Sequence, residues 1–226
     1  MSDRIVEIHL NAPPMNALGT ASMEQLLADL DAAAGAPVLL TGAGRAFSAG
    51  LDLREVASLD DAGMVAFLDL LDRMVAALFQ HPAPVVAAVH GHAIAGGAVL
   101  ALCCDAAVAT DSPKARIGLN EVALGLQFPP ITFQVVRARL DPRHIGTVLL
   151  GAGLHDPAEA LRLGLVDAVA PDPVAAARER LSALARHPAD ATPLPSARSE
   201  PASPRSAPRT DRRSWTTWCP SGRATR

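Results

Sequence analysis

The sequence is poor in lysine: Lys114 is its single lysine, against 19 arginines in 226 residues. Positive charges do not exceed negative ones, since the formal net charge is −3. This balance excludes the strongly basic character typical of proteins that bind nucleic acid or anionic membranes. Long apolar runs are also missing, because stretches such as 84–89 and 98–104 are much shorter than the ~18 residues of a membrane-spanning helix. We therefore expect a soluble protein with no nucleic-acid and no membrane partner.

Cysteine is scarce as well. Cys103, Cys104 and Cys219 are the three present, two of them adjacent and none in a C-x-x-C pair, which excludes a disulfide framework and a zinc site of that type. The first ten residues, M-S-D-R-I-V-E-I-H-L, lack the apolar core of a signal peptide. We expect a protein of the reducing cytoplasm that binds no metal.

Residues 1–190 alternate between strand and helix patterns, which indicates a single α/β domain with a sizeable core. Short runs rich in Val, Ile and Leu predict strands at 4–10, 37–41, 84–90 and 105–109. A capping-box pattern from Ser22 to Gln25 predicts that the first helix begins at Ser22. The helices predicted are 22–34, 61–80, 97–104, 130–140, 142–150, 156–163 and 173–185.

The composition changes abruptly at residue 191. Residues 191–226 hold six of the 19 prolines, seven arginines against two acids, and both tryptophans. This composition predicts a disordered basic tail. The excess of arginine over lysine indicates a GC-rich gene, so a C-terminus read out of frame is an equal alternative to a natural tail. Sequencing the gene would decide between them.

Two nucleotide-binding motifs are incomplete. The glycines at 91 and 96 have the spacing of a phosphate-binding loop, but Gly97 and Ala98 stand where Lys and Ser or Thr are required. The run 42–47 begins like a dinucleotide-binding fingerprint, but Phe47 replaces its third glycine. Neither a nucleoside triphosphatase nor a dinucleotide-binding protein is favoured.

Two further arrangements of reactive side chains give only weak evidence for a hydrolase nucleophile and for a metal site. The run A-F-S-A-G (46–50) is one substitution from a hydrolase nucleophile elbow around Ser48, but six residues separate Ser48 from the preceding strand at Thr41. His90 and His92 have no third ligand at a suitable local spacing for a metal. We interpret both histidines as polar residues at the end of a strand.

Three segments taken together carry a specific resemblance. F-S-A-G-L-D-L (47–53), A-G-G-A-V-L-A-L-C-C-D (95–105) and I-G-L-N-E-V-A-L-G-L (117–126) occur in the order and approximate spacing of the crotonase superfamily. A fourth segment at 149–169 is similar to the region that follows the active site in that superfamily. The resemblance covers about residues 4–185 and includes enoyl-CoA hydratases and isomerases, which act on coenzyme A thioesters.

The resemblance implies a fold and an assembly. The fold is a crotonase-like spiral of β-β-α units with helices at the C-terminal end, whereas periodicity alone would equally allow a doubly wound sheet. The assembly is a homotrimer or a hexamer made of two trimers, formed through C-terminal helices. The substrate is an acyl-CoA thioester, so coenzyme A belongs to the substrate and no separate cofactor is expected.

The resemblance also implies an oxyanion hole formed by the backbone N–H groups of Leu51 and Gly96. A helix start supports the second donor on physical grounds, because its first N–H groups are unpaired and carry partial positive charge. Close packing of a helix on a sheet is the alternative explanation for Gly96 and Gly97. Asp52 fits a helix cap or a loop-fixing carboxylate better than a catalytic group. The substrate-binding residues implied by the resemblance are Ser48, Ala49, Gly50, Asp52, Leu53 and Asn120, with the loop acting mainly through its backbone.

Glu121 is the candidate catalytic residue. Hydratases of the superfamily use two glutamates, and Val99 occupies the position of the first, while Glu121 matches the second. Hydration divides water activation and proton delivery between two carboxylates, whereas a double-bond shift needs only one. The pattern is similar to that of single-glutamate Δ3,Δ2-enoyl-CoA isomerases, and burial is expected to raise the pKa of Glu121. A hydratase, a non-catalytic acyl-CoA-binding homologue, and Glu121 as an ordinary surface acid are the alternatives.

Overall fold

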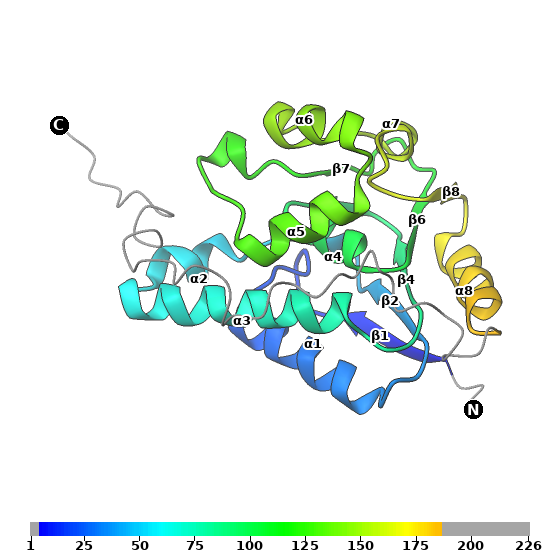
Figure 1. Ribbon diagram of the computed structural model, residues 1–226, viewed down its shortest axis with the longest axis horizontal. Helices are drawn as coiled ribbons and strands as arrows, with labels where there is room; N and C mark the ends of the chain where they lie inside the picture. The colour runs from blue at the N-terminus through cyan, green and yellow to red at the C-terminus, as the bar shows by residue number, and fades with distance from the viewer. Residues whose placement is uncertain (1–4, 187–226) are drawn as a thin grey trace.

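The computed structural model of the protein describes residues 5–186 (Figure 1). The predicted tail at 191–226 therefore lies outside the described residues. None of the helices within 5–186 is both long enough and apolar enough to cross a membrane.

A five-stranded parallel sheet forms the centre of the fold, in the order β1-β2-β4-β6-β8. Its strands are Val6–Leu10, Val38–Gly42, Val85–Val89, Ala106–Thr110 and Ala168–Ala170. The first four agree with the strands predicted from apolar runs. The side chains of β4 and β6 are buried along their whole length, as expected for parallel strands covered on both faces.

A second, three-stranded parallel sheet has the order β3-β5-β7. Its strands are very short: Ala46–Ser48, His92–Ile94 and Ile117–Gly118. Each follows directly after a strand of the large sheet, so the chain repeats a unit of one strand in each sheet and then a helix. This repetition is the β-β-α spiral implied by the resemblance.

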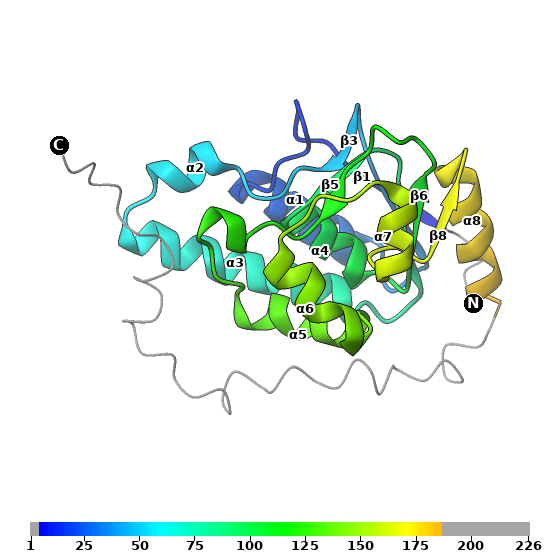
Figure 2. The same cartoon turned by 90° about the horizontal axis from the view of Figure 1, so that it is seen from above.

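The helices surround these sheets (Figures 1 and 2). They are α1 Thr20–Ala32, α2 Leu53–Ser58, α3 Asp61–Phe79, α4 Gly96–Cys103, α5 Pro130–Arg139, α6 Pro142–Gly151, α7 Pro157–Leu163 and α8 Pro173–Leu184, with a 3-10 turn η1 at Val122–Leu124. Asp141, Asp156 and Asp172 cap α6, α7 and α8, each followed by a proline at the first helical position. The sequence therefore marks these helix starts clearly.

The predicted start of α1 at Ser22 is wrong. The helix begins at Thr20 with Gly19 as its N-cap, and the hydroxyl of Ser22 accepts the N–H of Gly19 at 3.0 Å from inside the first turn. A serine and a polar residue three positions later resembled a capping box, but the serine lies at the third helical position and its side chain bonds back to the N-cap residue.

Two apolar clusters lie on opposite faces of the large sheet. On one face, Leu39, Val86 and Val108 pack with Ala177 and Leu181 of α8. The other face belongs to the main core, which also contains nearly all of α4. Cys103 and Cys104 are buried in this core, as expected for small apolar packing residues.

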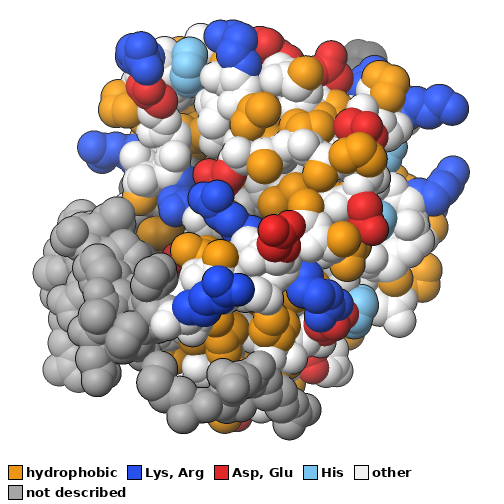
Figure 3. All heavy atoms as spheres, turned by 90° about the vertical axis from the view of Figure 1, so that its right-hand side faces the viewer, with side chains coloured by type: hydrophobic (Ala, Val, Ile, Leu, Met, Phe, Trp, Pro, Cys, Tyr) orange, Lys and Arg blue, Asp and Glu red, His pale blue; other side chains and the backbone are white. Residues whose placement is uncertain are grey.

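The end of the molecule that carries α8 is shown in Figure 3. Basic and acidic side chains are interspersed with apolar ones over the visible part of this face, without a continuous patch of one sign. Arg178 of α8 pairs with Glu7 of β1 at this end. The pair joins the last described helix to the first strand, and exposed pairs of this kind add little stability.

Candidate active site

A cavity of about 290 Å³ lies between the loop before α2 and helices α3, α4 and α5. The segments that carry the sequence motifs meet here with two helices. The lining residues are Ala49, Leu51, Leu53, Leu71, Val75, Ile94, Ala95, Gly96, Val99, Asn120, Glu121, Leu124, Leu126, Gln127, Pro129 and Thr132. Its walls are mainly apolar with a few polar groups, as is usual for small-molecule sites.

Hydrogen bonds from Asn16 fix the loop at 47–53. The Asn16 side-chain amide donates to the carbonyls of Ala43, Ala46 and Phe47 at 2.8, 2.7 and 3.2 Å. The buried Ser48 hydroxyl donates to the carbonyl of Asn16 at 2.7 Å and accepts the N–H of Gly50 at 3.2 Å. These bonds fix the backbone of the loop from which the N–H of Leu51 projects.

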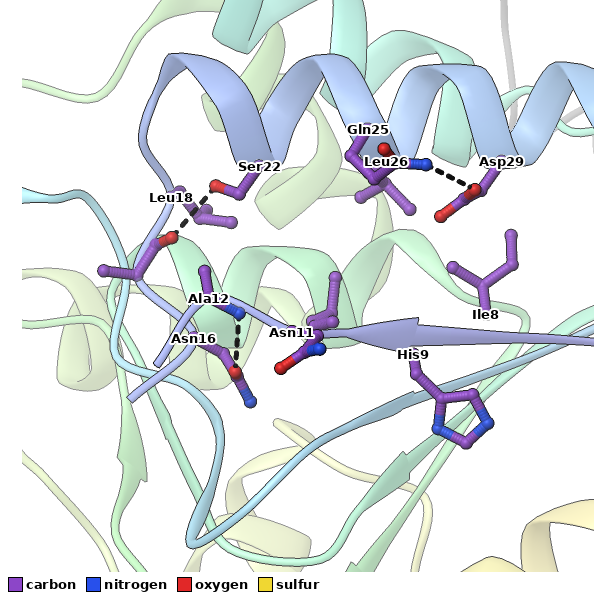
Figure 4. Close-up of a pocket in the computed structure, with 12 residues that line it drawn as sticks. Ile8, His9, Asn11, Ala12, Asn16, Leu18, Ser22, Gln25, Leu26 and Asp29 are labelled. Atoms are coloured by element: carbon purple, nitrogen blue, oxygen red, sulfur yellow. Dashed lines mark hydrogen bonds between the residues drawn. The ribbon is translucent and has the colours of Figure 1, made fainter. Parts of the chain in front are cut away.

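Asn16 also borders a second, smaller hollow between β1 and α1 (Figure 4). Its volume is about 60 Å³, and three of its polar side chains, Asn16, Ser22 and Gln25, are already hydrogen-bonded within the protein. Because this hollow is much smaller than the cavity of about 290 Å³, the larger cavity is the candidate site.

Gly50 and Gly96 bring the loop and α4 into close approach. Gly50 has a φ of +83°, and a Cβ on it would lie 3.1 Å from the nitrogen of Gly96. A Cβ on Gly96 would lie 3.8 Å from the nitrogen of Leu51. Neither N–H, of Leu51 or of Gly96, has an acceptor among the described residues. Two neighbouring unpaired N–H groups thus lie at the cavity, an arrangement able to stabilise an oxyanion.

Ala95 sets the direction of the start of α4. Its φ of 51° and ψ of −121° lie outside the regions that L-residues usually adopt. The conformation is held by its N–H, which donates to Gly118 at 2.8 Å, and by its carbonyl, which accepts from Val99 at 3.0 Å. A sparsely populated backbone conformation held in this way is common at functional sites.

The two glycines of α4 have different environments. A Cβ on Gly97 would lie 2.2 Å from the carbonyl oxygen of Ser48, so this position requires glycine for close packing on β3. Gly96 lines the cavity instead. The alternative explanation of close packing therefore holds for Gly97.

Glu121 is the one titratable side chain among the residues that line the cavity. It lies just before η1, and burial raises its pKa from 4.5 to about 7. Its Oε2 atom and the Oδ1 atom of Asn120 are buried and have no hydrogen-bond partner among the described residues. Val99 lines the same cavity from α4 and is 2% exposed. A single carboxyl group in apolar surroundings, with a pKa near neutrality, can act as a general base.

Comparison with known proteins agrees with these features. Residues 1–203 match the sequence profile described as enoyl-CoA hydratase/isomerase.

The chain belongs to the enoyl-CoA hydratase/isomerase family.

Its relatives carry both activities in their names. A putative enoyl-CoA hydratase of Thermus thermophilus is 37% identical over 176 residues, which are 74% of this chain and 68% of the relative. The mitochondrial enoyl-CoA delta isomerase 1 of Mus musculus is 33% identical over 175 residues, 74% of this chain and 60% of the relative. The chain thus spans less than two thirds of the mouse protein.

A solved structure shows that the fold is that of the family. The crystal structure of an enoyl-CoA hydratase from Mycobacterium ulcerans superposes with a TM-score of 0.81 at 30% identity, covering 89% of this chain and 90% of that chain. The crotonase-like fold predicted from the motifs is confirmed. The names do not separate hydratase from isomerase, so the choice depends on the site.

Not every predicted binding residue of this family member lines the cavity. Ala49, Leu53 and Asn120 do, together with Leu51, Gly96 and Glu121. Ser48, Gly50 and Asp52 support it from outside its walls. Asp52 is the N-cap of α2 and accepts the N–H groups of Arg54 and Glu55, which confirms the predicted capping role.

Sequence reasoning missed the wall formed by α3 and α5. Leu71 and Val75 of α3, with Thr132 of α5, lie outside the recognised motifs. Leu71 and Val75 lie in the helix predicted at 61–80, but helical periodicity cannot show that a helix face lines a cavity. The part of the chain that the structure describes holds no group of three or more side chains suited to a metal ion.

Proposed function

We propose that the protein is a Δ3,Δ2-enoyl-CoA isomerase, which moves the double bond of a 3-enoyl-CoA to the 2-position. The observation that carries this proposal is the single titratable side chain of the cavity, Glu121, with the aliphatic Val99 facing the same space. Hydration needs one group to activate water and another to protonate carbon. A double-bond shift needs one group that takes and returns a proton.

In the proposed reaction the Glu121 carboxylate removes a proton from C2 of the substrate. The electrons of that C–H bond form a double bond between C1 and C2, and the carbonyl π electrons move onto the thioester oxygen. The enolate is conjugated with the C3–C4 double bond, which gives a dienolate. The carboxylic acid then returns the proton to C4, and the double bond forms between C2 and C3. Glu121 ends the cycle as it began, so no further proton donor is required.

The N–H groups of Leu51 and Gly96 are proposed to hold the thioester oxygen. Negative charge develops on this oxygen during the reaction, and donors already in place stabilise it without reorganisation. Loss of one such donor typically costs about 10²–10³ in rate. The close approach through Gly50 supports this assignment, because it leaves both N–H groups unpaired beside the cavity.

The test is to incubate the protein separately with a 3-enoyl-CoA and with a 2-enoyl-CoA. The 3-enoyl-CoA deuterated at C2 should yield a 2-enoyl-CoA with deuterium transferred to C4, and the 2-enoyl-CoA should gain no water. Glu121→Gln should abolish the transfer, while Glu24→Gln, at an exposed position on α1, should not. Hydration without isomerisation, or an active Glu121→Gln variant, would contradict the proposal.

One observation favours hydratase activity as the second candidate. The Oδ1 atom of Asn120 and the Oγ1 atom of Thr132 are buried without partners, and both residues line the cavity with Glu121. Such groups can hold a water molecule in place of a second carboxylate. Formation of a 3-hydroxyacyl-CoA from the 2-enoyl-CoA would favour this candidate. Binding of both thioesters without turnover would favour a non-catalytic acyl-CoA-binding protein.

A further inference from the structure

Thr132 is a polar residue of an otherwise apolar wall of the cavity. The residue is 4% exposed, and its Oγ1 atom has no hydrogen-bond partner among the described residues. The wall around it consists of Leu71 and Val75 of α3 and Val99 of α4, all buried. A buried hydroxyl without a hydrogen-bond partner is unfavourable. A ligand that supplies a partner is therefore bound in preference to a ligand that does not.

The position of Thr132 in α5 explains why its hydroxyl is unpaired. A threonine within a helix commonly bonds to the carbonyl three or four residues earlier. Thr132 is the third residue of α5, so the residue four positions earlier, Phe128, precedes the helix. The carbonyl of Pro129 accepts the N–H of Phe133, and no side chain caps this helix start. The hydroxyl is thus left without a partner inside the protein, on a residue that lines the cavity.

The burial of the lining residues shows which side of the cavity is closed. Leu53 and Leu124 are 55% and 53% exposed and form the rim. Leu71 and Val75, on the wall that carries Thr132, are 5% and 1% exposed. A chain that enters past the rim therefore meets Thr132 in the closed interior.

The charges of the lining residues restrict the group that could meet this hydroxyl. None of the described lining residues is lysine, arginine or histidine, and Glu121 is a carboxyl group itself. A terminal carboxylate on the ligand would be buried without a counter-charge, which is strongly unfavourable. A neutral hydroxyl or keto group can exchange a hydrogen bond with Thr132 at no such cost.

We propose that Thr132 is a specificity-determining residue that selects acyl-CoA substrates whose acyl chain carries a neutral oxygen substituent, a hydroxyl or keto group. The inference rests on the proposed function, because that function places the thioester at Leu51 and Gly96 and the acyl chain in the cavity. It deepens that function by naming the class of acyl chain. Plain alkenoyl chains are accepted, and oxygenated chains are preferred.

The experiment measures binding of saturated thioesters, which cannot react. Octanoyl-CoA and a series of hydroxyoctanoyl-CoAs, with the hydroxyl group moved along the chain from C5 to C8, are titrated into the protein by calorimetry. For each protein, the affinity for a hydroxyoctanoyl-CoA is divided by the affinity for octanoyl-CoA. At one hydroxyl position this ratio should be roughly tenfold higher for the wild type than for Thr132→Val, because the wild type gains one hydrogen bond. Thr132→Ser, which keeps the hydroxyl group, should retain this preference.

Thermal unfolding of both variants verifies that they are folded. Equal relative affinities in wild type and Thr132→Val at every hydroxyl position would overturn the inference. An acyl-CoA whose chain ends in a carboxylate should bind the wild type more weakly than octanoyl-CoA does, and tighter binding would overturn the charge argument. Failure to bind octanoyl-CoA at all would instead contradict the proposed function.

Discussion

The raised pKa of Glu121 predicts a pH-dependent stability that Glu121→Gln removes. Burial raises this pKa from 4.5 to about 7, so the folded protein holds the proton more tightly than the unfolded chain does. The stabilisation that results is complete below the unfolded pKa of 4.5 and is lost as the pH rises through about 7. At about 1.4 kcal/mol per pKa unit, the loss amounts to about 3 kcal/mol.

Glu121→Gln carries no titrating group at this position. The free energy of unfolding of the variant, relative to that of the wild type, should therefore rise by about 3 kcal/mol between about pH 4 and about pH 8. The measurement is urea-induced unfolding at a series of pH values, followed by circular dichroism. Glu24→Gln, exposed on α1, is the matched control and should follow the wild type at every pH.

The same pKa should govern catalysis. The general base must be ionised, so kcat/KM for a 3-enoyl-CoA should rise with pH up to about 7 and fall roughly tenfold per pH unit below it. Parallel stability curves for wild type and Glu121→Gln would refute the reasoning, because Glu121 would then be an ordinary surface acid. A rate that shows no change around neutrality would refute it from the kinetic side.

Three further predictions concern the surroundings of the site. Gly50→Ala should lower turnover by a factor of about 10²–10³, because its Cβ would lie 3.1 Å from the nitrogen of Gly96. Gly44→Ala is the control, since Gly44 has a similar φ of +76° and a Cβ on it would meet nothing within 4 Å, so turnover should stay near wild type. Steady-state kinetics compares the two variants. Asn16→Ala should lower the free energy of unfolding by about 2 kcal/mol in urea titrations, since three loop carbonyls lose their donor. For Asp72→Asn, the free energy of unfolding relative to that of the wild type should be higher at about pH 8 than at about pH 4. The reason is that burial, and then the charge of Asp69, raise the pKa of Asp72 to about 7. Unlike Glu121→Gln, which should have no turnover, Asp72→Asn should leave turnover and its pH profile unchanged.

The elements that the sequence predicted are those with a strong local pattern. The strands β1, β2, β4 and β6 are apolar runs bounded by turn residues, and α3 has a long apolar stripe. The strands of the small sheet contain only two or three residues each, which is too few for any alternation to appear. They exist because the large sheet and α4 hold adjacent segments side by side.

The site was predicted in its residue types but not in its shape. Motifs named Leu51, Gly96, Asn120 and Glu121, all of which line the cavity. The wall that carries Thr132 has no motif, because an apolar helix face looks the same in sequence whether it meets a core or a cavity. The predicted trimer or hexamer remains a prediction, which light scattering of the purified protein tests.

The sequence by itself determined which chemical groups are available: one glutamate in an apolar motif, an aliphatic residue at Val99, and glycines at positions 50, 96 and 97. Only the tertiary structure decided what those groups can do. The pKa of Glu121 is raised by burial under segments distant in the chain. The N–H groups of Leu51 and Gly96 are unpaired neighbours because packing holds Gly50 and Ala95 at positive φ. Burial and backbone direction depend on contacts across the whole fold, and no local pattern of residues records them.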